Sequence, residues 1–216
     1  MMALTTVLFD LDGTLIDSVR LILDSYHHTL AVHGLAPMDD AHWLAGLGTP
    51  LRVQFRPWSE DPERLEAMIA TYREYNLTHH DAMVTPYPGT VEMVRAIRAA
   101  GYRTGLVTSK NRPGALRGLR LVGLEDTMEL IIGPDEVKHP KPHPEPILTA
   151  LEVLGEPAAC TLYVGDSVHD MESGRAAGVR TAAVLWGPFG REDLAATEPD
   201  HWLERPGDLL ELLGIG

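Results

Sequence analysis

Four short apolar runs, separated by segments with helical periodicity, set the strongest constraint on the fold of this chain. Between the runs, apolar residues recur at three- and four-residue spacing, as in residues 90–101 and 144–155, and glycine stands where each of these helices is expected to end. Strands that alternate with helices favour an α/β fold with a doubly wound, Rossmann-like parallel sheet, in which ligands bind at the carboxyl ends of the strands. The predicted buried strands are residues 5–11, 104–109, 160–166 and 180–186.

One region of the sequence breaks this alternation. From about Ser18 to Met83 there are helical patterns and no convincing strand, which indicates an inserted helical subdomain. The exit from this region, VTPYPGT, carries two prolines and a glycine, as expected of a stiff hinge. We therefore predict an α/β core domain of residues 1–16 and 84–216 and a helical cap domain of residues 17–83.

The composition is that of an ordinary globular protein with an acidic surface. Of the 216 residues, 44% are hydrophobic and 23% are charged, and the formal net charge is -13. Such a field repels nucleic acid and acidic membranes, so we expect neither as a partner. A phosphorylated anion would bind only where lysines or a metal ion reverse the local field.

Cysteine content and the N-terminal sequence bear on the cellular compartment. The single cysteine, Cys160, cannot form an internal disulfide, so nothing points to an oxidising compartment. Residues 1–15 have no basic segment ahead of their short apolar run, which argues against a signal peptide and against a membrane span. We expect a cytoplasmic protein that is a monomer or a homodimer.

The first apolar run ends in the sequence DLDGT, which places two carboxylates and a glycine at the end of a strand. A loop that turns at Gly13 can bring backbone N–H groups and the Thr14 hydroxyl beside Asp10 and Asp12, which would form an anion site next to two acids. The alternative is that both aspartates are only turn residues. A calcium loop is excluded by the spacing, because Leu15 stands where the glycine of such a loop is required.

Two further segments offer groups that bind anions. Thr108 and Ser109 follow the second apolar run, although a hydroxyl residue after a strand is also a common helix N-cap. In the segment KHPKPHPEP, residues 138–146, alternating prolines stiffen the backbone and direct Lys141, which suits a lysine that bridges two anions. The alternative for this segment is a solvated approach to the next helix. The prolines also prevent a helical pair of His139 and His143, so they predict no zinc site there.

The third run is followed by GDSVHD, which places Asp166 at a strand end and Asp170 on the first turn of a helix. Both carboxylates can face one metal ion, whereas the alternative has Asp166 capping the helix and Asp170 exposed. Acids gathered at adjacent strand ends repel one another by roughly 4 kcal/mol per close pair, so their joint ionisation requires a cation. Mg²⁺ fits a site made only of oxygen ligands.

In this order the motifs DLDGT, TSK, KP and GDSVHD resemble the phosphatase branch of the haloacid dehalogenase superfamily, with a small helical (C1) cap inserted after the first strand. The resemblance covers essentially the whole chain. It implies that Asp10 is the nucleophile that forms an aspartyl-phosphate, and that Asp12 is the general acid that later activates water. Thr108 and Lys141 would hold the phosphoryl oxygens.

The resemblance also implies the ligands of a Mg²⁺ cofactor. These are the Asp10 carboxylate, the Asp12 backbone carbonyl and Asp166, with Asp170 either a ligand or an anchor for one. The residues expected to bind the phosphorylated substrate are Gly13, Thr14, Thr108, Ser109, Lys141 and Arg52. Arg52 belongs to the cap segment LAGLGTPLR, where a solvated arginine is the alternative.

A narrower resemblance lies in residues 71–81 and 190–204, which are similar to haloacid dehalogenase-type inorganic pyrophosphatases related to phosphoglycolate phosphatases. The segment His79 to Asp81 has a plain helix end as its alternative, and His27 and His28 stay undecided. We expect a Mg²⁺-dependent phosphohydrolase whose substrate is pyrophosphate or a small phosphorylated metabolite such as phosphoglycolate. The alternatives are a sugar phosphatase or phosphomutase, and a non-catalytic regulatory or binding protein on the same fold.

Overall fold

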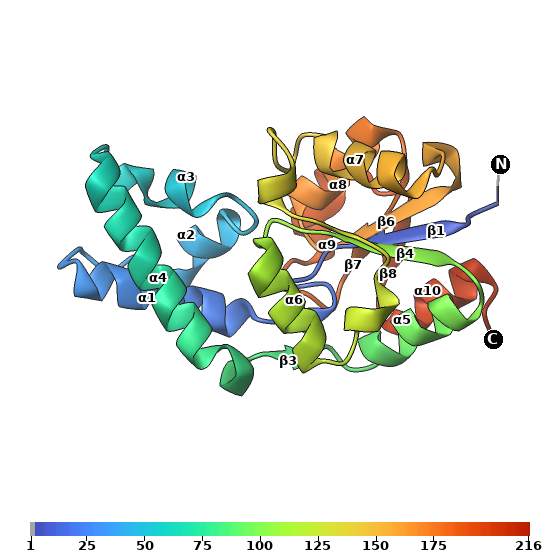
Figure 1. The fold of residues 1–216 in the computed structure, drawn as a ribbon, viewed down its shortest axis with the longest axis horizontal. Helices are drawn as coiled ribbons and strands as arrows, with labels where there is room; N and C mark the ends of the chain where they lie inside the picture. Colours follow the sequence, from blue (N-terminus) through green and yellow to red (C-terminus); the bar gives the residue numbers. More distant parts are fainter. Residues whose placement is uncertain (1–2) are drawn as a thin grey trace. The chain divides into compact units, whose positions relative to one another are not determined.

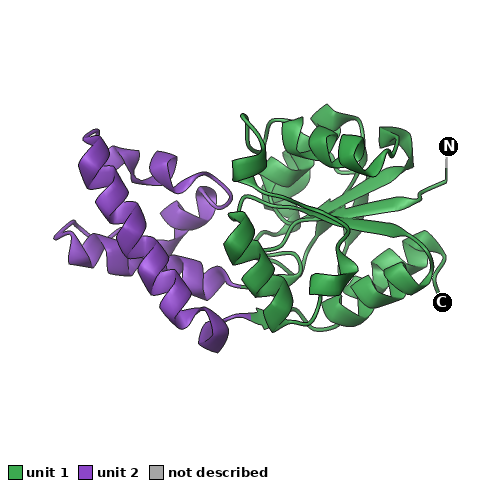
Figure 2. Ribbon diagram, viewed as in Figure 1, with its two compact units in different colours: residues 1–17, 85–216 green, residues 18–84 purple. Residues whose placement is uncertain are grey.

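The computed structural model describes residues 3–216, which form two compact units (Figure 2). Unit 1 contains the chain up to Asp17 together with Thr85–Gly216, and unit 2 is Ser18–Val84. Unit 2 begins and ends one residue later than the predicted cap domain.

Unit 1 is built on a six-stranded parallel sheet with the strand order β5-β4-β1-β6-β7-β8. The four predicted strands are β1, β4, β6 and β7, and the predicted doubly wound α/β fold is confirmed. β5 and β8 were not predicted, because two and three residues are too few to show a pattern. The strands are β1 (Thr6–Phe9), β4 (Arg103–Val107), β5 (Ile131–Ile132), β6 (Thr161–Gly165), β7 (Arg180–Val184) and β8 (His201–Leu203).

Helices cover both faces of this sheet, with α7 and α8 on one face and α5 and α10 on the other (Figure 1). Both predicted helices are present: α5 ends at Ala99, and α7 ends at Leu154, with the left-handed Gly155, whose φ is 67°, as its C-cap. The helices are α5 (Thr90–Ala99), α6 (Arg112–Leu121), α7 (Glu145–Leu154), α8 (Val168–Ala177), α9 (Arg191–Leu194) and α10 (Pro206–Leu213), with short 3₁₀ turns at Glu125–Thr127, Pro134–Glu136, Ala158–Cys160 and Ala195–Thr197.

The core of unit 1 lies between the sheet and these helices. Leu8, Val107 and Tyr163 of the central strands are fully buried and pack with Ile147 and Leu151 of α7. Because both faces of the strands are covered, the strand sequences are continuous apolar runs instead of alternating ones. Burial of each large aliphatic side chain contributes about 1.5–3 kcal/mol to this packing.

The chain leaves unit 1 after β2 (Ile16–Asp17) and returns to it at β3 (Thr85–Pro86). The two strands pair in antiparallel fashion, with Ile16 opposite Pro86. Beyond β3, the Thr90 hydroxyl donates to the Leu15 carbonyl oxygen at 2.9 Å. The proline-containing exit predicted as a hinge is therefore hydrogen-bonded to the segment through which the chain departs.

Unit 2 is helical, as predicted, with an aromatic core. The Tyr26 ring stacks on Trp43 with centroids 4.1 Å apart and planes 2° apart, and it also meets Phe55 and Tyr72. The long helix α4 begins at Pro62 because the Asp61 side chain accepts the Glu63 amide. The elements of this unit are α1 (Val19–Val32), α2 (Asp40–Ala45), α3 (Leu51–Phe55), the 3₁₀ turn Arg56–Trp58 and α4 (Pro62–Met83).

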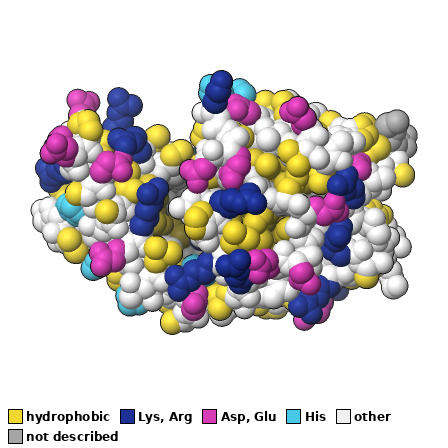
Figure 3. Space-filling view, viewed as in Figure 1, with side chains coloured by type: hydrophobic (Ala, Val, Ile, Leu, Met, Phe, Trp, Pro, Cys, Tyr) yellow, Lys and Arg dark blue, Asp and Glu magenta, His cyan; other side chains and the backbone are white. Residues whose placement is uncertain are grey.

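Charged side chains of both signs lie on the surface of the protein. On the face drawn in Figure 3, lysine and arginine side chains are interspersed with aspartate and glutamate, while the sequence carries a net charge of -13. Within residues 3–216, every helix is too short or too polar to span a lipid bilayer.

Two side chains of α4 provide a test of how unit 2 is stabilised. Met68 is fully buried whereas Leu77 is 49% exposed, although both lie on the same helix. We expect Met68→Ala to lower the free energy of unfolding by about 2–5 kcal/mol, because it leaves a cavity. Leu77→Ala should lower it by less than half as much. Urea denaturation of both variants measures the difference, and equal losses would contradict the assigned core.

Candidate active site

The strand order brings the predicted site residues to one edge of the sheet. β1 lies between β4 and β6, with Phe9 in register with Leu106 on one side and Val164 on the other. The Asp10 amide donates to the Val164 carbonyl at 2.9 Å, so Asp10 lies beside the end of β6. Because β4 and β5 extend from one side of β1 and β6 from the other, this edge is a topological switch point, where α/β sheets bind ligands.

Lys141 is the central cation of the site. Its side chain is only 4% exposed, and Nζ donates to Asp10 Oδ1 at 2.9 Å and to Asp170 Oδ1 at 2.6 Å. Burial alone would lower the pKa of Lys141, but the carboxylates of Asp10 and Asp170 outweigh it and raise that pKa well above its usual value. The ammonium group therefore stays charged and ties the end of β1 to α8.

Asp170 is held by the first turn of α8. The helix N-cap is Ser167, whose hydroxyl donates to Asp170 Oδ2 at 2.6 Å and whose amide donates to the same oxygen at 3.0 Å. Asp170 is fully buried, so the alternative with Asp166 as the cap and Asp170 exposed is wrong. Burial alone would raise the pKa of Asp170, but Lys141 and the hydrogen bonds lower it.

Asp166 lies against the loop that follows β1. The Thr14 hydroxyl donates to Asp166 Oδ1 at 2.8 Å, so in this structure Thr14 orients a carboxylate of the site. Gly13 has a φ of 89°, and a side chain at this position would overlap the Asp166 carboxyl group. Among residues 3–216, Asp166 Oδ2 is one of the few buried side-chain atoms without a hydrogen-bond partner. Such an atom, in a carboxylate that offers an oxygen within 4.8 Å of oxygens of Asp10 and Asp170, suits a metal ligand.

The segment after β4 supplies a second lysine. Lys110 Nζ donates to Asp12 Oδ1 at 2.8 Å, a contact that the predicted set of site residues did not include. Thr108 Oγ1 accepts the Lys110 amide at 3.2 Å, and Thr108 is not a helix N-cap, because α6 begins at Arg112 with Asn111 as its cap. Within the described chain, the buried Ser109 Oγ also has no hydrogen-bond partner.

Asp10, Asp166 and Asp170 offer oxygen atoms that all lie within 4.8 Å of one another. Burial, reinforced by Asp170, raises the pKa of Asp10 to about 7 against the opposing effect of Lys141, and burial also raises the pKa of Asp166 well above its usual value. With Asp12, four carboxylates face the two ammonium groups, an excess of two negative charges when all are ionised. The donor set therefore fits a hard divalent cation.

Tyr163, in the middle of β6, is a site residue that the sequence did not identify. Its hydroxyl accepts from Lys141 Nζ at 3.0 Å and lies 2.8 Å from the Val107 carbonyl and 2.9 Å from Asp170 Oδ1. A hydroxyl has one proton, so it donates to only one of those two acceptors at a time. Tyr163 is therefore a positioning residue for Lys141, and within an apolar strand it shows no local signal of this role.

The remaining candidates belong to unit 2. Arg52 pairs with Glu66 on the surface, with 56% of its side chain exposed. His27 Nε2 lies 2.6 Å from Asp40 Oδ1, and the His28 ring stacks on Tyr75. The His79 ring lies tilted against Tyr75, with centroids 4.3 Å apart, and the buried His80 contacts Asp81. A substrate contact by any of these residues stays a prediction.

Comparison with known proteins places the chain in a family. Residues 7–184 match the profile described as haloacid dehalogenase-like hydrolase. The chain belongs to this family. It is thus a hydrolase, and the predicted resemblance to the superfamily is confirmed.

Similar proteins include two bacterial pyrophosphatases. The chain is 44% identical over 214 residues to the pyrophosphatase PpaX of Anoxybacillus flavithermus, covering 99% of both chains. It is 39% identical over 214 residues to the PpaX of Halalkalibacterium halodurans, again with 99% of each covered.

Solved structures share the fold. A Bacteroides fragilis protein proposed to be a haloacid dehalogenase-like hydrolase matches with a TM-score of 0.89 and 30% identity over 95% of this chain and 99% of that one. A Lactobacillus plantarum protein proposed to be a phosphoglycolate phosphatase matches with a TM-score of 0.86 and 27% identity, covering 98% of this chain and all of the other (100%).

The role of Tyr163 can be measured through stability. Tyr163→Phe removes the hydroxyl from a buried, charged network and should lower the free energy of unfolding by about 1–3 kcal/mol. Tyr102→Phe is a matched control, because the Tyr102 hydroxyl donates only to the half-buried Leu213 carbonyl at 2.9 Å. Denaturant titration compares the two, and a larger loss for Tyr102→Phe would remove the assigned role of Tyr163.

Proposed function

We propose that this family member is a Mg²⁺-dependent inorganic pyrophosphatase that works through an aspartyl-phosphate at Asp10. The observation that carries the proposal is the 44% identity to a pyrophosphatase along 99% of both chains. The geometry supports it, because a buried carboxylate, a buried lysine and a cluster of acids meet at the carboxyl edge of the sheet. These are the parts that phosphoryl transfer requires.

In the proposed reaction, an Asp10 carboxylate oxygen attacks one phosphorus atom of pyrophosphate. A bond forms between that oxygen and phosphorus, while the bond from phosphorus to the bridging oxygen breaks and its electron pair leaves with the second phosphate. Lys141, which holds Asp10 Oδ1 at 2.9 Å, fixes the orientation of the carboxylate. Attack requires the ionised form of Asp10, which the neighbouring ammonium group favours.

Asp12 would act as the general acid and then as the general base. It gives a proton to the departing phosphate and then takes one from the water molecule that attacks the aspartyl-phosphate. The second step breaks the bond between phosphorus and the Asp10 oxygen, which restores both carboxyl groups. Lys110 holds Asp12 through Oδ1 at 2.8 Å and so restricts the carboxyl group to this edge of the sheet.

Substrate oxygens would be bound by groups around these acids. We propose that Thr108, Ser109 and Lys141 hold the transferred phosphoryl group, together with backbone N–H groups near Gly13. The Mg²⁺ ligands would be Asp10, Asp166 and the Asp12 carbonyl oxygen, with Asp170 as a ligand or an anchor. When bound, Mg²⁺ would neutralise negative charge on the phosphoryl oxygens.

Phosphoglycolate is the second candidate substrate, and one observation favours it. The structure from Lactobacillus plantarum, with 27% identity and a TM-score of 0.86, is proposed to be a phosphoglycolate phosphatase. The chemistry at Asp10 would be the same for both substrates, so the preference for pyrophosphate or phosphoglycolate would depend on residues outside the core. We propose that residues 17–83 form the cap domain that makes this choice, with Arg52 as its anion-binding side chain.

The proposal is tested by comparing kcat/KM for pyrophosphate, phosphoglycolate and a hexose phosphate. We expect the highest value for pyrophosphate and a loss of about a thousandfold or more for Asp10→Asn on all three, because an amide cannot attack phosphorus. Circular dichroism controls for the fold of the variant. Near-normal turnover by folded Asp10→Asn would remove the nucleophile assignment.

Different outcomes of that comparison separate the substrates. A clear preference for the hexose phosphate would move the proposal to a sugar phosphatase. Arg52→Ala should raise KM for pyrophosphate while leaving an aryl phosphate, bound only by the core, nearly unaffected. Equal effects on both substrates would show that Arg52 does not contact the second phosphate.

The charge of the site predicts how pH changes the response to Mg²⁺. Asp10 has a folded-state pKa of about 7 against an ordinary value of 3.8, so its stabilising contribution is lost as pH rises through about 7, and Asp166 acts in the same direction. The pKa of Asp170 is lowered and that of Lys141 raised, so neither titrates in this window. Mg²⁺ should therefore raise Tm more at about pH 8 than at about pH 5.

Thermal unfolding with and without Mg²⁺ at the two pH values measures this effect. Asp166→Asn should reduce the Mg²⁺-induced rise, whereas the exposed Asp126→Asn should preserve it. An equal rise at both pH values would contradict a cation held by carboxylates with raised pKa values.

A further inference from the structure

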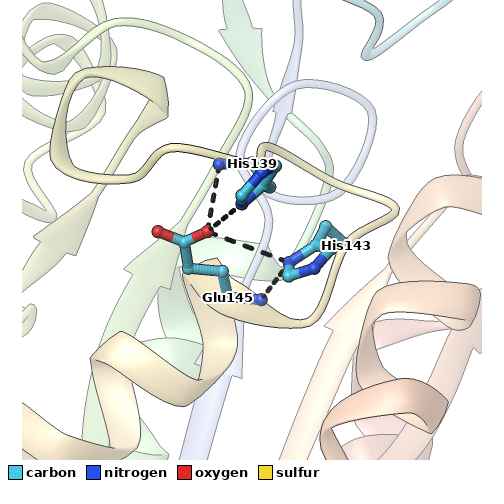
Figure 4. Close-up of side chains that lie close together, drawn as sticks. All are labelled: His139, His143 and Glu145. Atoms are coloured by element: carbon cyan, nitrogen blue, oxygen red, sulfur yellow. Dashed lines mark hydrogen bonds and ion pairs between the residues drawn. The ribbon is translucent and has the colours of Figure 1, made fainter.

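A second group of metal-binding side chains lies on the segment before α7 (Figure 4). His139, His143 and Glu145 each offer a donor atom, and these atoms all lie within 4.8 Å of one another. We propose that these three residues bind a divalent transition-metal ion such as Zn²⁺, at a site distinct from the carboxylates around Asp10.

The backbone brings the two histidines together without a helix. The His143 amide donates to the Pro140 carbonyl at 3.0 Å, which closes a turn and places the two imidazole rings 4.7 Å apart with planes 36° apart. The prolines prevent a helical pair, which is why the sequence predicted no zinc site here, but the turn still brings the two rings together. Proline fixes φ at several positions of the segment, so little conformational entropy remains to be lost on metal binding.

The carboxylate of Glu145 is held in place by backbone donors. Glu145 is the first residue of α7, and its Oε1 accepts the Lys138 amide at 2.8 Å while Oε2 accepts the His139 amide at 3.1 Å. Oε2 also lies 2.7 Å from His139 Nδ1 and 3.9 Å from His143 Nδ1. His143 Nδ1 also accepts the Glu145 amide at 3.1 Å, so hydrogen bonds already hold the three side chains together (Figure 4). An ion would bind His143 through Nε2, or through Nδ1 once that hydrogen bond is broken.

Their chemistry differs from that of the acidic cluster. Two imidazole nitrogens and one carboxylate oxygen form a donor set typical of Zn²⁺, whereas the Asp10 cluster offers only oxygen atoms, which suit Mg²⁺. The side chains of His139, His143 and Glu145 are 64%, 50% and 28% exposed, so an ion reaches them directly from solvent. Three protein ligands leave one tetrahedral position for water.

The position of this site in the chain gives metal binding a structural consequence. Lys141 lies between the two histidines in sequence, and its Nζ reaches Asp10 and Asp170. An ion held by His139, His143 and Glu145 would bridge both ends of the turn that carries Lys141. Binding should therefore stabilise this turn and raise the melting temperature of the folded protein.

The experiment is a calorimetric titration of the full chain with Zn²⁺ in saturating Mg²⁺, which under the proposed function fills the oxygen-only cluster. We expect one Zn²⁺ per chain, with binding weakened at least about tenfold in His139→Gln/His143→Gln. The control His28→Gln/His42→Gln removes two exposed histidines of unit 2 and should leave the Zn²⁺ stoichiometry and affinity unchanged. Circular dichroism verifies that each variant is folded.

Imidazole resonances of the wild-type protein provide a readout that needs no variant. Zn²⁺ should change the NMR chemical shifts of the ring nitrogens of His139 and His143 and leave the chemical shifts of the other histidines unchanged. Absence of Zn²⁺ binding by the wild type, unchanged affinity in folded His139→Gln/His143→Gln, or shifts confined to other histidines would each overturn the proposal.

Discussion

The Lys141 ammonium group, buried between two carboxylates, is the interaction on which the rest of the site depends. An isolated buried charge is so unfavourable that removing one partner of such a pair typically costs about 3–5 kcal/mol. Here one cation contacts Asp10 after β1 and Asp170 on α8, so a single group links the end of a strand to a helix. The Tyr163 hydroxyl accepts a further hydrogen bond from Lys141 Nζ. The hydroxyl of Ser167, the N-cap of α8, holds the Asp170 carboxylate that Lys141 contacts.

Much of this arrangement could be predicted from the sequence, because the apolar runs that mark the buried strands, and the polar residues that follow them, are local sequence patterns. A parallel sheet buries both faces of its strands, so β1, β4, β6 and β7 appear as apolar runs, and the residue after each run must lie at the carboxyl edge. That argument is sufficient to bring Asp10, Thr108 and Asp166 together. It does not require knowledge of the loops.

The remainder depends on contacts between residues far apart in the sequence. Tyr163 resembles any other apolar strand residue until the fold brings Lys141 to its hydroxyl group, from 22 residues away. Lys110 reaches Asp12 across 98 residues, and its own neighbours give no sign of the contact. The turn that joins His139 to His143 was equally hidden, since the proline pattern excludes a helix without specifying which turn replaces it. The strands β5 and β8 have only two and three residues, which is too short for a recognisable pattern of apolar residues.

The electrostatics of the site also bear on what a bound cation would do under the proposed function. If all four carboxyl groups were ionised, the two ammonium groups would leave an excess of two negative charges, and the raised pKa values of Asp10 and Asp166 follow from their burial and from this crowding of acids. An anion brought to this edge without a counterion meets repulsion of several kcal/mol at the distances involved. Under the proposed function, Asp10 and Asp166 would hold a divalent cation, which would favour their ionised forms and offset their charge. Such a cation would favour the binding of an anionic substrate, in a protein whose overall charge of -13 opposes it.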